Sequence, residues 1–167
     1  MATQQQRKRD LVDKPEGTLH KLKVLQKNPD YISIARKICV GAGTVFLVLG
    51  LLGFVVPAMW GAHLNLAHNL IHIVTGIVSL WIGYLATDRT VREFNAVFGA
   101  FYGLLGVLGF LVGEPMVAST PMVMDDNYLL VIWPNVLELG AADHAFHLIV
   151  GAILFASGLA QDKYMPR

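Results

Sequence analysis

The sequence has few charged residues and almost no cysteine. Only 15% of its 167 residues are Asp, Glu, Lys or Arg, whereas 54% are hydrophobic, and in soluble domains about a quarter of the residues are charged. Cys39 is the one cysteine, which excludes an internal disulfide and a cysteine-based metal site. The sequence also contains no Gly-rich phosphate loop and no His-Glu-x-x-His helix. We therefore predict a non-catalytic membrane protein.

Four apolar stretches approach the length of about 20 residues that a helix needs to cross the hydrocarbon core. They are Ile38–Val56, Leu66–Leu85, Phe94–Val112 and Asp143–Ala160. Thr90 and Glu93 form a capping box just before the third stretch. A chain of this length is too short to bury four such helices in a soluble core. The predicted fold is an all-α membrane protein, a four-transmembrane-helix bundle over residues 38–160, with an external loop at 113–142.

The distribution of Lys and Arg predicts the orientation in the membrane. The first connection (57–65) and the third (113–142) contain neither residue, whereas residues 1–37 contain nine of the thirteen. Cytoplasmic loops of membrane proteins carry the excess of Lys and Arg, so we expect both termini in the cytoplasm. No mid-span Asp, Glu, Lys or Arg is present to form an ion pathway, which argues against transport.

The two terminal segments are predicted to be cytoplasmic extensions of the bundle. Residues 1–37 form a basic N-terminal tail, and its segment 17–27 places leucines among lysines in a pattern typical of a helix on an anionic membrane surface. Residues 161–167 form the C-terminus. The basic residues flank apolar segments without a stacked aromatic platform, so we expect no nucleic acid partner. The expected partners are membrane lipids and other membrane-protein subunits.

The chain contains an internal repeat. Shifting the first span by 56 positions aligns Gly43, Gly50, Gly53 and Phe54 with Gly99, Gly106, Gly109 and Phe110. Shifting the second span by 75 positions aligns His72, Gly76 and Gly83 with His147, Gly151 and Gly158, and His68 with Asp143. We predict a duplicated two-helix unit whose halves are related by a pseudo-twofold axis along the membrane normal.

The repeat places a candidate site at the outer ends of the second and fourth spans. His68 and His72 are four residues apart and share one helical face, and Asp143 and His147 occupy the equivalent positions. Three imidazoles and a carboxylate suit a transition metal such as Zn²⁺. Two of the histidines could instead hold a haem iron, or one a chlorophyll magnesium. The competing interpretation is structural, since imidazoles can form hydrogen bonds between membrane helices without any ligand.

At these residues the sequence resembles an uncharacterised bacterial family of small four-span membrane proteins. The resemblance rests on Leu49–Phe54, on His68-Asn69-Leu70-Ile71-His72, and on Asp143 followed by His147 and Gly151. It implies the four-span fold and a marked position for the histidines, and it implies no mechanism. We predict a location in the bacterial cytoplasmic membrane or an internal membrane. Our prediction is an accessory or structural subunit of a larger membrane complex. The alternative is a protein that ligates a metal, haem or chlorophyll through the His/Asp cluster.

Overall fold

The computed structural model describes residues 32–119 and 125–160. The predicted amphipathic segment at 17–27 and the C-terminal residues 161–167 lie outside the described residues. Helices and three short strands follow one another from residue 34 to residue 159. They are α3 (Ile34–Leu52), η1 (Met59–Gly61), α4 (Leu66–Leu85), α5 (Asp88–Val112), β1 (Glu114–Val117), β2 (Asp125–Trp133), β3 (Leu137–Leu139) and α6 (Ala141–Leu159).

The predicted set of four apolar helices is confirmed. α3, α4, α5 and α6 are each long and apolar enough to cross a membrane. Their outward faces are apolar as well, with exposed side chains that include Val74, Trp81, Val97 and Leu111. Such faces suit lipid, because a helix that is hydrophobic all round is stable only in a core or a membrane.

α3, α5 and α6 each begin before the predicted position, and the added residues of α3 and α5 include charged ones. α3 ends at Leu52 and α6 at Leu159, before the predicted Val56 and Ala160. α3 begins at Ile34 and so includes Arg36. The guanidinium of Arg36 donates to the Asp88 carboxylate at 2.8 Å and to the carbonyls of Gly83 and Ala86 at 2.6 and 2.8 Å. α5 begins at Asp88, and the N-cap is Thr87, whose hydroxyl accepts from the Thr90 amide. The predicted capping box opening the helix at Thr90 was therefore wrong.

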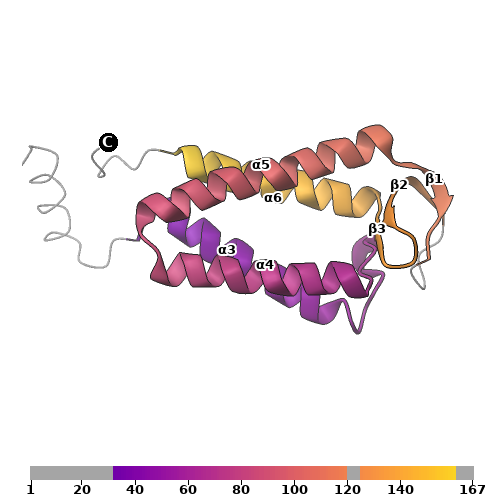
Figure 1. Cartoon of the computed structure of the whole chain (residues 1–167), viewed down its shortest axis with the longest axis horizontal. Coiled ribbons are helices and arrows are strands. Elements are labelled where there is room, and N and C mark those ends of the chain that lie inside the picture. Colours follow the sequence, from indigo (N-terminus) through magenta and orange to yellow (C-terminus); the bar gives the residue numbers. More distant parts are fainter. Residues whose placement is uncertain (1–31, 120–124, 161–167) are drawn as a thin grey trace, which may run out of the picture. The chain divides into compact units, whose positions relative to one another are not determined.

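The helices pack as two pairs, α3 with α4 and α5 with α6 (Figure 1). Glycines allow the close approach in each pair. A Cβ atom added to Gly76 would lie 2.6 Å from the Leu47 backbone nitrogen, and one added to Gly106 would lie 2.7 Å from the His144 carbonyl oxygen. The buried Asn95 links the pairs, because its amide donates to the Ala35 carbonyl at 2.8 Å and to the Ser157 hydroxyl at 2.9 Å.

The segment predicted as an external loop contains a small antiparallel sheet with the strand order β1-β2-β3. The sequence predicted an all-α fold with an external loop at 113–142, and the strands within this segment were not predicted, since periodicity over a few residues is a weak signal. The sheet lies at one end of the helices (Figure 1). Tyr128 of β2 contacts Phe110 of α5 at a ring-centroid distance of 5.4 Å. The Glu138 carboxylate accepts from the amides of Ser119 and Asn135 at 2.9 and 3.0 Å, which ties the connecting segments to β3.

A candidate three-histidine metal site

The start of α4 places two of the histidines. Asn65 is the N-cap residue, and its side chain accepts from the His68 amide at 3.0 Å. The helix then holds His68 and His72 one turn apart on the same face. Gly53, in the turn just after α3, leaves room for the Asn69 side chain, whose amide donates to the Leu64 carbonyl at 3.0 Å. This packing fixes the rotation of α4, so both histidines face the interior.

The start of α6 places the third histidine. Oδ2 of Asp143 accepts from the Gly140 amide at 2.8 Å and from the His63 amide at 3.0 Å. The first bond caps the helix, and the second joins it to the connection that precedes α4. His147 follows one turn later. The same carboxylate therefore sets the start of α6 and its position against the α4 side of the site.

The three rings lie close together in the interior. Their centroids are 4.3 Å apart for His68 and His72, 5.9 Å for His68 and His147, and 6.4 Å for His72 and His147. Each residue is only 2% exposed. One ring nitrogen from each histidine lies within 4.8 Å of the other two. Two nitrogens bound tetrahedrally at about 2.0–2.1 Å from one ion are about 3.4 Å apart, so small ring rotations suffice.

Four of the nine buried side-chain nitrogen and oxygen atoms that lack a hydrogen-bond partner in the described part of the chain belong to the three clustered histidines. Among the described residues, both nitrogens of His72, Nε2 of His68 and Nδ1 of His147 are buried without a hydrogen-bond partner. Leaving such an atom unsatisfied costs about 1–3 kcal/mol, and native proteins rarely do so. Several in one cluster point to a ligand that these nitrogens share.

The tautomer of His68 follows from its hydrogen bond. Its Nδ1 lies 2.8 Å from the His63 carbonyl oxygen, which can only accept. Nδ1 therefore carries a proton, and in the Nδ1–H tautomer Nε2 keeps its lone pair. A histidine ligand is commonly held in this way, by a backbone carbonyl that accepts from its other nitrogen.

Aromatic side chains surround the cluster. Phe46 of α3 lies 5.4 Å from the His72 ring, and Tyr102 of α5 lies 5.1 Å from the His147 ring. Phe46 and Tyr102 contact each other at 4.9 Å. All four helices therefore contribute to a mostly apolar shell, which limits the access of water and rigidifies the imidazoles.

A pocket leads to the cluster from the side. It has a volume of about 310 Å³, and its lining includes Trp60, Leu64, His72, Asp143 and Phe146. Trp60 is 85% exposed and marks the outer rim. A metal site requires a path by which the ion or an exogenous ligand enters, and this pocket supplies it.

The four residues predicted for the site do not play equal parts. His68, His72 and His147 come together as predicted, but Asp143 does not join the group of atoms able to share one ion. Its Oδ1 lies 3.9 Å from His68 Nδ1, the nitrogen that is already protonated. Asp143 thus stands behind the His68 ring and positions the backbone around it.

Sequence reasoning gave no role to His63, which is fully buried. Its carbonyl orients His68, its amide binds Asp143, and its Nε2 donates to Oδ2 of Asp126 at 3.3 Å. Burial alone would raise the pKa of the Asp126 carboxyl, but hydrogen bonds from the Tyr128 and Ala141 amides and from His63 outweigh burial and lower it. A histidine just before an Asn cap was the only available sequence signal.

His144 is also buried but lies on the other side of α6. Its Nε2 donates to the Tyr128 carbonyl at 2.8 Å, and its ring packs against Phe110 and Gly109 of α5. His144 therefore anchors β2 to the helices and is not part of the cluster.

No protein-family model, no curated protein and no solved structure matches this chain.

Proposed function

We propose that the protein is an integral membrane protein that holds one first-row transition-metal ion on His68, His72 and His147. The observation that carries the proposal is the convergence of three buried imidazoles whose nitrogens lie within 4.8 Å and largely lack hydrogen-bond partners among the described residues. Imidazole suits Zn²⁺, Cu²⁺, Fe²⁺ and Ni²⁺. Three protein nitrogens leave a fourth position for water or an exogenous ligand.

The number of converging histidines favours an ion over the haem or chlorophyll alternatives. A haem iron takes two axial side chains at most, and a third imidazole would then remain buried without a partner. A single ion would take one nitrogen from each of the three rings.

The proposed ion joins two halves of a duplicated unit. An offset of 56 residues aligns α3 with α5, and an offset of 75 residues aligns α4 with α6. The same offsets also relate the contacts within one helix pair to those within the other. Arg36 donates to the Gly83 carbonyl, and Arg92, 56 positions on, donates to the Gly158 carbonyl, 75 positions on. Phe46 against His72 corresponds in the same way to Tyr102 against His147.

The pattern of buried and exposed residues along α3 and α5 supports the same duplication. We compare each residue from Ala35 to Gly53 with the residue 56 positions later, from Val91 to Gly109. In every pair, both residues are buried, both are half-buried or both are exposed. Such agreement is expected where two copies of one packing arrangement meet around a pseudo-twofold axis. His72 and His147 are then equivalent ligands, and His68, whose counterpart is Asp143, breaks the symmetry.

The proposed membrane placement follows the Lys and Arg distribution. It puts the Arg36 end of the bundle in the cytoplasm and the sheet and histidines near the outer surface. The resemblance to a bacterial four-span family fits a cytoplasmic or internal bacterial membrane. An accessory role in a larger complex, without catalysis, remains a prediction.

Metal analysis of the purified protein tests the proposal. After incubation with Zn²⁺ and removal of excess metal, the parent should hold about one ion per chain, and His68→Ala, His72→Ala and His147→Ala should each hold little or none. The matched control is His144→Asn, which changes a buried histidine of the same helix to the residue found at the equivalent position 69. It should bind like the parent.

Thermal melting in detergent separates the metal role from the structural one. Loss of a hydrogen bond between membrane helices costs about 1–2 kcal/mol or less. Apparent binding free energies of structural Zn²⁺ reach about 10–16 kcal/mol. Chelator should therefore lower the melting temperature of the parent strongly and leave His72→Ala unchanged. A parent that takes up no metal and ignores chelator would contradict the proposal.

A further inference from the structure

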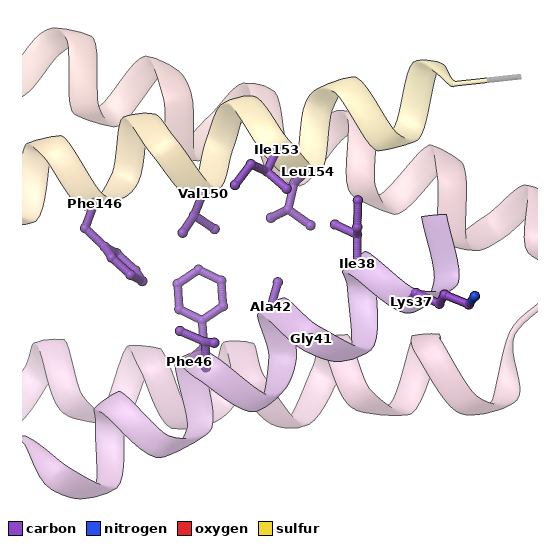
Figure 2. Close-up of a pocket in the computed structure, with 10 residues that line it drawn as sticks. Lys37, Ile38, Gly41, Ala42, Phe46, Phe146, Val150, Ile153 and Leu154 are labelled. Carbon is purple, nitrogen blue, oxygen red and sulfur yellow. The ribbon is translucent and has the colours of Figure 1, made fainter. Parts of the chain in front are cut away.

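A second pocket lies between α3 and α6. It has a volume of about 340 Å³ and is lined by apolar residues, with Lys37 as the one charged side chain (Figure 2). Gly41 and Ala42 leave it wide on the α3 side, and Phe46 and Phe146 face each other at the far end. Their ring centroids are 6.1 Å apart.

The corresponding face of α5 is filled by aromatic rings. Phe98, which is 56 positions after Ala42, stacks on Phe94 at 4.8 Å and contacts Phe101 at 6.4 Å. Phe94 also packs beside Ile82 against the buried cluster that includes Val91. The side chains of α5 thus fill the space that corresponds to the open pocket beside α3. Apolar walls without contacting atoms forfeit dispersion energy, so the open face favours an apolar occupant.

We propose that this pocket binds one acyl chain of an anionic phospholipid and that Lys37 pairs with its phosphate group. Lys37 is exposed at one end of the pocket. Its neighbour Arg36 is bonded to Asp88 and to backbone carbonyls, so among the described residues that line the pocket Lys37 supplies the positive charge. A lysine at a membrane interface extends its ammonium to the headgroups while its stem stays in the apolar layer.

The length of the pocket fits one leaflet. From Lys37 to Phe46 the helix rises nine residues, or about 14 Å. Half of a hydrocarbon core of about 30 Å is about 15 Å. A chain whose headgroup meets Lys37 therefore reaches the two phenylalanines near the middle of the membrane. The inference rests on the proposed membrane placement, which makes this the cytoplasmic leaflet, and not on the metal site.

Native mass spectrometry in mild detergent tests the inference. The probes are phosphatidylglycerol and phosphatidylcholine with identical acyl chains. The parent should retain one phosphatidylglycerol per chain, in about fivefold preference to phosphatidylcholine, as expected for one lysine near the headgroup. Lys37→Gln should remove the preference, and Lys37→Arg should keep it.

A substitution that fills the pocket provides a second test of the inference. Ala42→Phe introduces at position 42 the aromatic ring that Phe98 provides on the corresponding face of α5. This ring should fill the pocket and abolish lipid retention. Thr44→Phe, on an exposed position of α3 outside the pocket, is the matched control and should retain lipid like the parent. Zn²⁺ content should be the same in all variants, so loss of the lipid site and loss of the metal site are read separately.

Three results would overturn the inference. The first is equal retention by Ala42→Phe and the parent, and the second is equal binding of the two lipids by the parent. The third is a dimer of the parent that Ala42→Phe dissociates without any change in bound lipid, because a second copy would then cover the pocket.

Discussion

Two glycines four residues apart in α5 should respond in opposite ways to the same substitution. A Cβ atom added to Gly99 would clash with the Phe155 backbone nitrogen and lie 2.7 Å from both the Gly151 carbonyl oxygen and the Phe155 Cα. These are backbone atoms of α6, so relief requires the helices to separate. A Cβ atom added to Gly103 would meet nothing within 4 Å.

The magnitudes follow from packing and helix propensity. Overpacking costs about 1–3 kcal/mol, and replacing glycine by alanine in a helix returns up to about 1 kcal/mol. We expect Gly99→Ala to destabilise the bundle by about 2 kcal/mol and Gly103→Ala to be neutral or to stabilise it by up to about 1 kcal/mol. Reversible unfolding in mixed detergent micelles, followed by circular dichroism, measures both. Equal stability of the two variants would refute the close packing of α5 on α6.

Three further predictions concern topology, the tail and pH. Reporters fused after Arg167 or inserted between Ala86 and Thr90 should read cytoplasmic and one near Asp125 external; a cytoplasmic signal at Asp125 would reverse the orientation. Deleting Met1–Gly17 should leave the four spans folded and weaken co-purification with a partner complex, and unchanged association would remove the tail from the interface. Because hydrogen bonds hold the pKa of Asp126 below its usual value of 3.8, its ionised form stabilises the fold above that pH. This stabilisation should be lost as the pH falls through the lowered pKa. Melting temperatures between pH 2 and 6 should therefore decline less for Asp126→Asn than for the parent, and parallel curves would contradict the assigned bonds.

The sequence was sufficient to predict the helices but not their ends. The predicted span Leu66–Leu85 coincides with α4, because Asn65 is a strong cap and the apolar run is uninterrupted. α3 begins earlier than hydropathy indicates, since a charged residue normally ends a span. Here Arg36 is accommodated by Asp88 and two carbonyls that are distant in sequence. Such partners appear only once the helices are packed.

The site was predictable in part for the same reason. The i, i+4 spacing of His68 and His72 fixes a shared face, and the offset of 75 residues extends that reasoning to His147. The roles of Asp143 and His63 depend on how the connections fold back over the helix ends. Backbone hydrogen bonds decide this, and no periodicity reports them.

X-ray absorption at the zinc edge tests the metal site most directly. For the Zn²⁺-loaded parent we predict a first shell with three imidazole nitrogens at about 2.0–2.1 Å and one further light ligand. His72→Ala, loaded under the same conditions, should lose this imidazole signature, and His144→Asn should keep it. A parent spectrum without imidazole scattering, or one that His72→Ala reproduces, would contradict a metal centre on these three histidines.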